Sequence, residues 1–173
     1  MQAAAWSCAR SWAMLKAPLL GMLLLSLSMT PCEPDPGDDE DGVHQAAEIE
    51  ALVQEASDIL KRQGHRAFAG FRMKNSHWRH ADVYLFVTDM RGVILFNAEH
   101  PDHEGRNLLD ERDADGKQFR KDFIAVVRGS GSGWVDYMFP RPGQTVPVVK
   151  WGYVSETCVD EIPALVGAGV YVD

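Results

Sequence analysis

Residues 82–96, DVYLFVTDMRGVILF, contain two runs of β-branched and aromatic residues separated by a short polar segment. Such runs favour extended strands, and the intervening Asp89-Met90-Arg91-Gly92 is typical of a tight turn. We therefore predict an antiparallel hairpin with strands at 82–88 and 93–96. Side chains alternate along a strand, so one face should pack against helices while the other is available to line a pocket. The two expected faces consist of Tyr84, Phe86 and Thr88, and of Val83, Leu85 and Val87.

Two helices and three further strands surround this hairpin in the sequence. Apolar residues recur at steps of three and four from residue 46 to residue 60, which predicts an amphipathic helix that ends at Gly64. A second, shorter helix should be opened by residues 113–116 and end at Gly129. Strands are predicted at 133–139, 146–155 and 165–172, with links of hairpin length between them. The predicted fold class is α+β, built on an antiparallel sheet.

The first forty or so residues precede this domain and predict export. Arg10 and Lys16 come before a short apolar run, residues 17–29, which is typical of a signal peptide and too short to span a bilayer comfortably. An uncleaved membrane anchor is the alternative, and whether translation starts at Met1 or Met14 is open. We predict a signal peptide at 1–32, an acidic disordered linker at 33–42 and one folded domain at 43–173. The protein should be periplasmic or secreted.

Charge and cysteine content narrow the classes of partner. The chain has 17 basic and 25 acidic residues, a balance that disfavours binding to nucleic acid or anionic lipid. An anionic ligand would need a local pocket with its own cation. Because Cys8 lies in the predicted signal peptide, Cys32 and Cys158 form at most one disulfide. Whether they pair is open, since cleavage after residue 32 would leave Cys158 alone.

A series of short motifs resembles the Cache family of extracytoplasmic sensor domains, over about residues 68–171. The motifs are residues 82–92, His100-Pro101 with 105–108, 113–117, 133–137, Pro140 with Pro142, Lys150 with Tyr153, and 166–171. This resemblance implies a PAS-like sheet of five to six strands with a long N-terminal helix and a second short helix. It also implies capture of small carboxylates, amines or related metabolites on one face of the sheet. Cache domains usually continue into a signalling domain, whereas this chain ends at Asp173. We therefore expect a stand-alone binder that reports to a separate, membrane-bound signalling partner, or a remnant whose partner has been lost.

Two cations and six aromatic residues are candidates for the ligand site. Lys150 interrupts an apolar strand, and a buried ammonium needs an anion such as a bound carboxylate; the alternative is an edge-strand lysine that extends into solvent. Arg72 would hold a carboxylate by a pair of hydrogen bonds, although a solvated surface arginine fits the sequence as well. The aromatic residues would shape the pocket or form plain core. The predicted ligand-binding residues are Arg72, Trp78, Tyr84, Phe86, Trp134, Tyr137, Lys150 and Tyr153.

The sequence predicts neither an enzyme nor a metal site. No motif presents a Ser or Cys nucleophile beside a histidine and a carboxylate. The pairs His77/His80 and His100/His103 lie in polar loops without a helix to fix them, so we expect no bound metal and no cofactor. The predicted function is a sensor module that binds a small organic acid. The alternative is an interaction module that docks on a membrane receptor or enzyme partner without a ligand.

Overall fold

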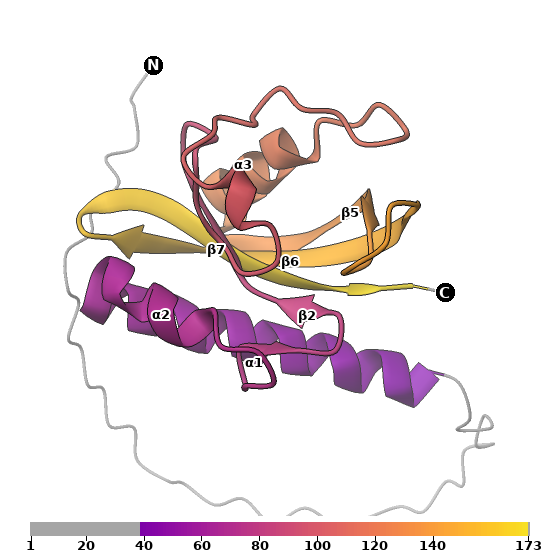
Figure 1. Ribbon diagram of the computed structural model, residues 1–173, viewed down its shortest axis with the longest axis horizontal. Coiled ribbons are helices and arrows are strands. Elements are labelled where there is room, and N and C mark those ends of the chain that lie inside the picture. Colours follow the sequence, from indigo (N-terminus) through magenta and orange to yellow (C-terminus); the bar gives the residue numbers. More distant parts are fainter. Residues whose placement is uncertain (1–38, 173) are drawn as a thin grey trace, which may run out of the picture.

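The computed structural model describes residues 39–172, which form one sheet covered by helices on both faces (Figure 1). The helices are α1 (Asp39–Gln63), η1 (Gly64–Ala67), α2 (Phe68–Phe71), η2 (Pro101–His103) and α3 (Phe119–Ser130). The strands are β1 (Arg79–His80), β2 (Val83–Tyr84), β3 (Phe86–Asp89), β4 (Ile94–Asn97), β5 (Ser132–Pro140), β6 (Pro147–Val159) and β7 (Ile162–Tyr171). The predicted α+β class is confirmed.

The main sheet has five antiparallel strands in the order β4-β3-β7-β6-β5. The chain therefore inserts β7, its last strand, between the first hairpin and the β5–β6 hairpin. In this register β3 pairs with β7 through Phe86 and Gly167, and β5 pairs with β6 through Tyr137 and Lys150. Residues from both ends of the domain thus meet at the centre of the sheet. The two-residue strands β1 and β2 form a separate small hairpin.

Helix α1 packs along one face of the sheet, and its C-terminal half is tied to the β6–β7 hairpin (Figure 1). Its apolar stripe is fully buried at Val53, Ala56 and Leu60. Ser57, also fully buried, donates its hydroxyl to the carbonyl of Glu156 at 2.7 Å, and Thr157 donates to the carbonyl of Ser57 at 3.1 Å. These bonds satisfy polar groups inside the core and fix the helix against one end of the sheet.

The end of α1 adds a second tie to the same hairpin. Gly64 has a φ of +59°, the left-handed conformation that the sequence predicts for a residue after the helix. A side chain at this position would overlap the Asp160 carboxylate. With glycine here, the carboxylate comes close enough to accept a hydrogen bond from the backbone N–H of His65, at 3.2 Å. The His65 ring also contacts this carboxylate. The C-terminal end of α1 is therefore anchored by contacts on both sides of Gly64.

Helix α3 covers the opposite face of the sheet and forms a second apolar cluster there (Figure 1). Phe119, Phe123 and Val127 are buried against Phe86 and Val135 of the sheet. Phe86 and Phe123 stack with their ring centroids 5.5 Å apart. The sheet thus separates two cores, one under α1 and one under α3.

Several boundaries differ from the sequence predictions. Helix α1 begins at Asp39, inside the predicted linker 33–42, because acidic residues are favoured in the first turn of a helix. The first predicted strand is interrupted at Leu85. The last two strands extend to Val159 and Ile162, because the link between them is a tight turn at Asp160 and Glu161, with φ of 47° and 70°. Helix α3 starts only at Phe119, after the turn at 113–116. The short helices η1, α2 and η2 were not predicted.

Some predictions concern residues outside the described range. The signal peptide 1–32, residues 33–38 of the linker, and Cys32 all lie there. Cys158 is described and is disulfide-bonded. No helix within residues 39–172 is long and apolar enough to cross a membrane.

Candidate functional site: an aromatic pocket beside a buried lysine

A small cavity of about 30 Å³ lies between helix α3 and the sheet, in the second apolar cluster. Its volume corresponds to roughly two water molecules. Aromatic rings make most of its wall, and polar groups come from two tyrosines, a threonine, an asparagine and an arginine. The cavity is lined by Tyr84, Phe86, Thr88, Ile94, Asn97, Phe119, Arg120, Phe123, Tyr137 and Phe139. This composition, apolar with a few converging polar groups, is that of a small-molecule site.

Lys150 lies beside this cavity, behind two of its aromatic walls. The side chain is fully buried, and its Nζ lies 3.9 Å from the ring centroid of Tyr84, 4.5 Å from that of Tyr171 and 5.8 Å from that of Phe139. Nζ also donates to the Tyr171 hydroxyl at 3.3 Å. Among the described residues, no carboxylate lies within ion-pair distance of this ammonium. The lysine is therefore stabilised by ring faces and one hydroxyl and has no paired anion.

The buried position of Lys150 changes its acid–base behaviour. Burial lowers the pKa of Lys150 to about 7, although the more distant Asp82 and Glu99 act in the opposite direction. The side chain therefore changes protonation in the physiological range, and an anion bound next to it would favour the ammonium form.

The tyrosines of the site keep their protons. Burial raises the pKa of Tyr84 and of Tyr137 well above the usual value, and raises that of Tyr171 to about 12. Tyr171 donates its hydroxyl to the carbonyl of Pro140 at 2.7 Å, which orients its oxygen toward Lys150. Each of these hydroxyls remains a hydrogen-bond donor at neutral pH.

Arg120 is a second buried cation, and it lines the cavity itself. Its guanidinium lies over the Phe119 ring at 4.5 Å and pairs with the Glu111 carboxylate. Burial lowers the pKa of Arg120, while Glu111 favours the charged form. Arg120 is not among the ligand-binding residues predicted from the sequence, although it falls on the apolar stripe of its helix with Phe123 and Val127. A charged residue inside an apolar stripe is the signal that could have identified it.

Glycines bring the rings of the site close to the sheet backbone. A Cβ at Gly167 would lie 2.5 Å from Cζ of Phe86, and one at Gly152 would lie 3.0 Å from Cε1 of Tyr137. A Cβ at Gly169 would lie 3.1 Å from Cε of Lys150. The two rings and the aliphatic part of Lys150 therefore pack directly against the backbone of these glycines.

The predicted site residues separate into two groups. Tyr84, Phe86 and Tyr137 line the cavity, and Lys150 adjoins it. Trp134 and Tyr153 lie on the other face of the sheet, packed on the α1 core with their ring centroids 5.2 Å apart. Trp134 donates its indole N–H to Glu50 at 2.7 Å, and Tyr153 donates its hydroxyl to Ser132 at 2.9 Å. The structure does not bring these two residues into the pocket.

Arg72 and Trp78 also lie away from the cavity. Arg72 pairs with Glu104 at 2.7 Å and lies over the Phe96 ring at 4.8 Å. Trp78 packs on Phe71 with a centroid distance of 4.8 Å, as part of the α1 core. Both residues therefore have structural contacts that satisfy them without a ligand.

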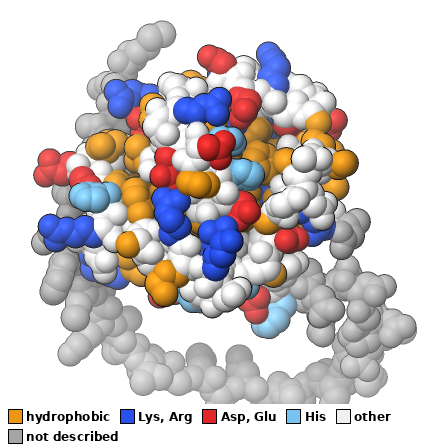
Figure 2. All heavy atoms as spheres, in the orientation of Figure 1, with side chains coloured by type: hydrophobic (Ala, Val, Ile, Leu, Met, Phe, Trp, Pro, Cys, Tyr) orange, Lys and Arg blue, Asp and Glu red, His pale blue; other side chains and the backbone are white. Residues whose placement is uncertain are grey.

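His100, next to η2, packs against two rings that line the pocket. Its ring lies edge-on to Phe139 at 5.4 Å and to Tyr84 at 6.2 Å. Burial and the neighbouring His103 lower the pKa of His100, so the ring is neutral at pH 7. On the face shown in Figure 2, acidic and basic side chains are interspersed.

Comparison with known proteins agrees with this architecture. The sequence model of the Cache domain matches residues 66–173, which include all five strands of the main sheet and all of the pocket-lining residues. The chain belongs to the Cache family. It resembles a solved periplasmic sensor domain of a chemotaxis protein, with 30% identity and a TM-score of 0.66 over 78% of this chain and 99% of that one. The resemblance inferred from the sequence motifs is confirmed.

Two further relatives carry functional descriptions. A solved Cache chemosensory domain described for carboxylic acid recognition is 26% identical, with a TM-score of 0.63, over 79% of this chain and 100% of that one. The methyl-accepting chemotaxis protein McpP of Pseudomonas putida is 29% identical over 133 residues, 76% of this chain and 24% of that protein. This Cache domain therefore spans about a quarter of the chemotaxis receptor it matches. It is a sensor domain related to the periplasmic domains of chemotaxis receptors.

Proposed function

We propose that this Cache domain binds a short monocarboxylate in the aromatic pocket and that Lys150 supplies the positive charge that holds it. The observation that carries the proposal is the buried ammonium without a paired anion. Removing an ammonium from water is costly, and ring faces and one hydroxyl offset that cost only in part. A carboxylate beside Nζ would complete the site with a charge-assisted hydrogen bond.

The position of Lys150 sets a condition on binding. Nζ contacts the Tyr84 and Phe139 rings, which line the cavity, whereas Lys150 itself does not line it, so we infer that a ligand that reaches the lysine displaces one of these rings. Phe139 is partly exposed, whereas Tyr84 is buried, which makes Phe139 the easier ring to move. We infer that the ligand enters on the Phe139 side, and that the tyrosine hydroxyls then bond its second oxygen.

The size of the cavity supports a short ligand. A volume of about 30 Å³ accommodates only a few heavy atoms before rings have to shift. Acetate and propionate therefore require the smallest displacement of the rings, whereas a dicarboxylate would need a larger cavity and a second cation. Arg120 is the nearest candidate for that second cation, but Glu111 already neutralises it.

The same proposal covers location and partners. The domain acts outside the cytoplasm, which the disulfide at Cys158 supports because such bonds persist in oxidising compartments. It passes the ligand signal to a membrane-bound signalling partner or domain, as expected for a relative of chemotaxis receptors, and it has no catalytic activity.

A thermal-shift series on the full-length chain tests the ligand class. Acetate, propionate, succinate, benzoate and methylammonium would be compared at equal ionic strength. A ligand at a hundred times its Kd stabilises a fold by about 2.7 kcal/mol, which corresponds to several degrees for a domain of this size. Acetate or propionate should raise the melting temperature, and methylammonium should not.

Two outcomes would count against the proposal. A shift with methylammonium alone would mean that the aromatic rings select a cation and that Lys150 is not the binding group. No shift with any acid would favour a module that docks on a partner without a small ligand.

A further inference from the structure

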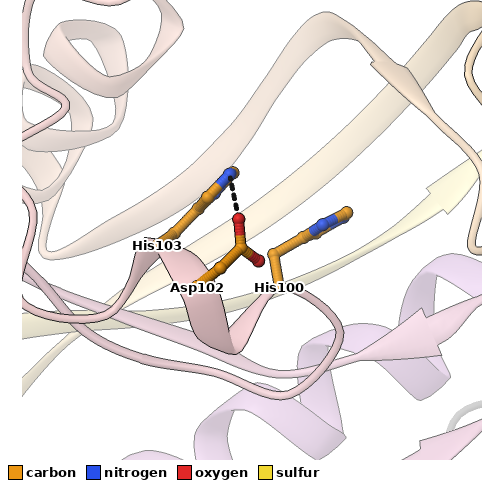
Figure 3. Close-up of side chains that lie close together, drawn as sticks. All are labelled: His100, Asp102 and His103. Carbon is orange, nitrogen blue, oxygen red and sulfur yellow. Dashed lines mark ion pairs between the residues drawn. The ribbon is translucent and has the colours of Figure 1, made fainter.

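Three potential metal ligands meet at η2, next to the pocket but outside it. His100, Asp102 and His103 each offer one ligand atom, and these atoms all lie within 4.8 Å of one another. Figure 3 shows the two imidazole rings side by side, with the Asp102 carboxylate next to them. The rings are nearly parallel, at 17°, with centroids 5.2 Å apart. The turn of η2 produces this arrangement because it brings residues three apart onto one side.

The two histidines lack partners for buried nitrogen atoms. Nε2 of His100 and Nδ1 of His103 are inaccessible and make no hydrogen bond. They are the only such side-chain nitrogen or oxygen atoms found in residues 39–172. Buried polar atoms in proteins are almost always hydrogen-bonded or bound to an ion, so two of them on adjacent stacked rings point to a ligand. His103 Nε2 also lies 3.7 Å from the Asp102 carboxylate, too far for a hydrogen bond.

We propose that His100, Asp102 and His103 bind a divalent transition-metal ion of the zinc type. Two imidazoles and a carboxylate suit this class of ion, which binds nitrogen and oxygen at about 2.0–2.2 Å. Ligand atoms around such an ion lie about 3.3 Å apart, so the present spacing needs a closure of about 1–1.5 Å. Asp102 is mostly exposed and free to make this movement. A fourth position remains for water or for a ligand group.

This site differs from the sequence prediction of no metal site. The sequence placed His100 and His103 in a polar loop, whereas η2 holds them on one turn and the Phe139 and Tyr84 rings back the His100 ring. The proposal does not rest on carboxylate binding. A metal ion here would add positive charge close to the pocket and stiffen the loop that carries Asn97.

Titration calorimetry with zinc chloride tests the site on the full-length chain after chelator treatment and dialysis. The wild type should bind one equivalent, and His103→Gln and Asp102→Asn should each bind at least tenfold more weakly. His80→Gln is the matched control, because His77 and His80 have the same spacing but His80 contacts only the Ser76 carbonyl at 3.3 Å. Its affinity should equal that of the wild type.

The variants also distinguish a loss of zinc binding from a loss of folding. Asp102 has a side-chain exposure of 72%, so Asp102→Asn should fold normally even if His103→Gln does not, and circular dichroism would verify this. The proposal is wrong if the wild type binds no stoichiometric zinc. It is equally wrong if folded Asp102→Asn binds zinc as tightly as the wild type and the His80→Gln control do.

Discussion

Replacing Lys150 with methionine should separate ligand binding from folding. The substitution keeps a long side chain in the space between Tyr84 and Tyr171 but removes the charge. A hydrogen bond to a charged group contributes about 1.5–3 kcal/mol, which corresponds to a loss of roughly 10- to 150-fold in acetate affinity. Titration calorimetry at pH 6.5 measures this loss.

The folded protein should tolerate the same substitution. Burial lowers the pKa of Lys150 from its usual value near 10.5 to about 7, so the ammonium form is disfavoured in the fold by up to about 5 kcal/mol. Methionine removes this cost and loses cation–π contacts of about 2 kcal/mol. Lys150→Met should therefore be as stable as the wild type at pH 6.5, or more stable, in urea unfolding.

The pH dependence gives a second, independent readout of Lys150. Between pH 7 and 10.5 the unfolded chain holds a proton on Lys150 that the folded chain has released, so wild-type stability should rise with pH relative to Lys150→Met. Acetate affinity should change in the opposite direction, because only the ammonium form binds the anion. Between pH 6.5 and 8.5 the wild type should lose about tenfold or more, and Lys150→Met should show no such slope. Equal acetate affinities for the two proteins at pH 6.5 would refute the assignment of Lys150 to the site.

Three further substitutions test the rest of the description. Arg120→Met should weaken acetate binding less than Lys150→Met does, because Glu111 already neutralises Arg120. Titration calorimetry on both variants compares the two losses of acetate affinity. A larger loss for Arg120→Met would mean that Arg120, and not Lys150, is the main cation that binds acetate. Trp134→Phe should leave the acetate Kd within about twofold and lower stability by about 1 kcal/mol, through loss of the bond to Glu50; a large change in Kd would place the indole in the binding path. Gly167→Ala should destabilise the fold by about 1–3 kcal/mol in urea, because the new methyl group would lie 2.5 Å from the Phe86 ring, and unchanged stability would contradict the tight contact.

The sequence predicted the elements of this fold better than their contacts. The period-two alternation of 82–88 and 133–139 and the helical period of 46–60 depend on neighbouring residues, so both are visible in a single sequence. The placement of β7 between two hairpins depends on residues far apart, such as Phe86 and Gly167, and no local pattern reports it. The sequence predicts a turn within residues 156–161 but not its exact position, because the two residues that adopt positive φ there, Asp160 and Glu161, are not glycines.

The candidate site was predicted only in part, because local patterns are visible in the sequence and contacts between distant segments are not. Alternation alone already places Trp134 and Tyr137 on opposite faces, and Lys150 and Tyr153, three residues apart, likewise cannot share a face of one strand. Selecting all four therefore mixed two faces of the sheet. Arg120 was missed because its burial results from packing of α3 on the sheet, a tertiary contact between distant segments.

Helix α1 extends beyond the contacts that hold it on the sheet. Ser57 and Gly64 fix its C-terminal half to the β6–β7 hairpin, and the contacts continue toward the N-terminus as far as Glu50, which accepts the Trp134 indole N–H, and Ile49, which is buried. Asp39 lies ten residues before Ile49, a distance of about 15 Å along the helix. Because the contacted part of α1 follows the sheet, a shift of the sheet beneath a ligand would move the whole helix. A tilt of about 3° about Ile49 would add about 0.8 Å at Asp39.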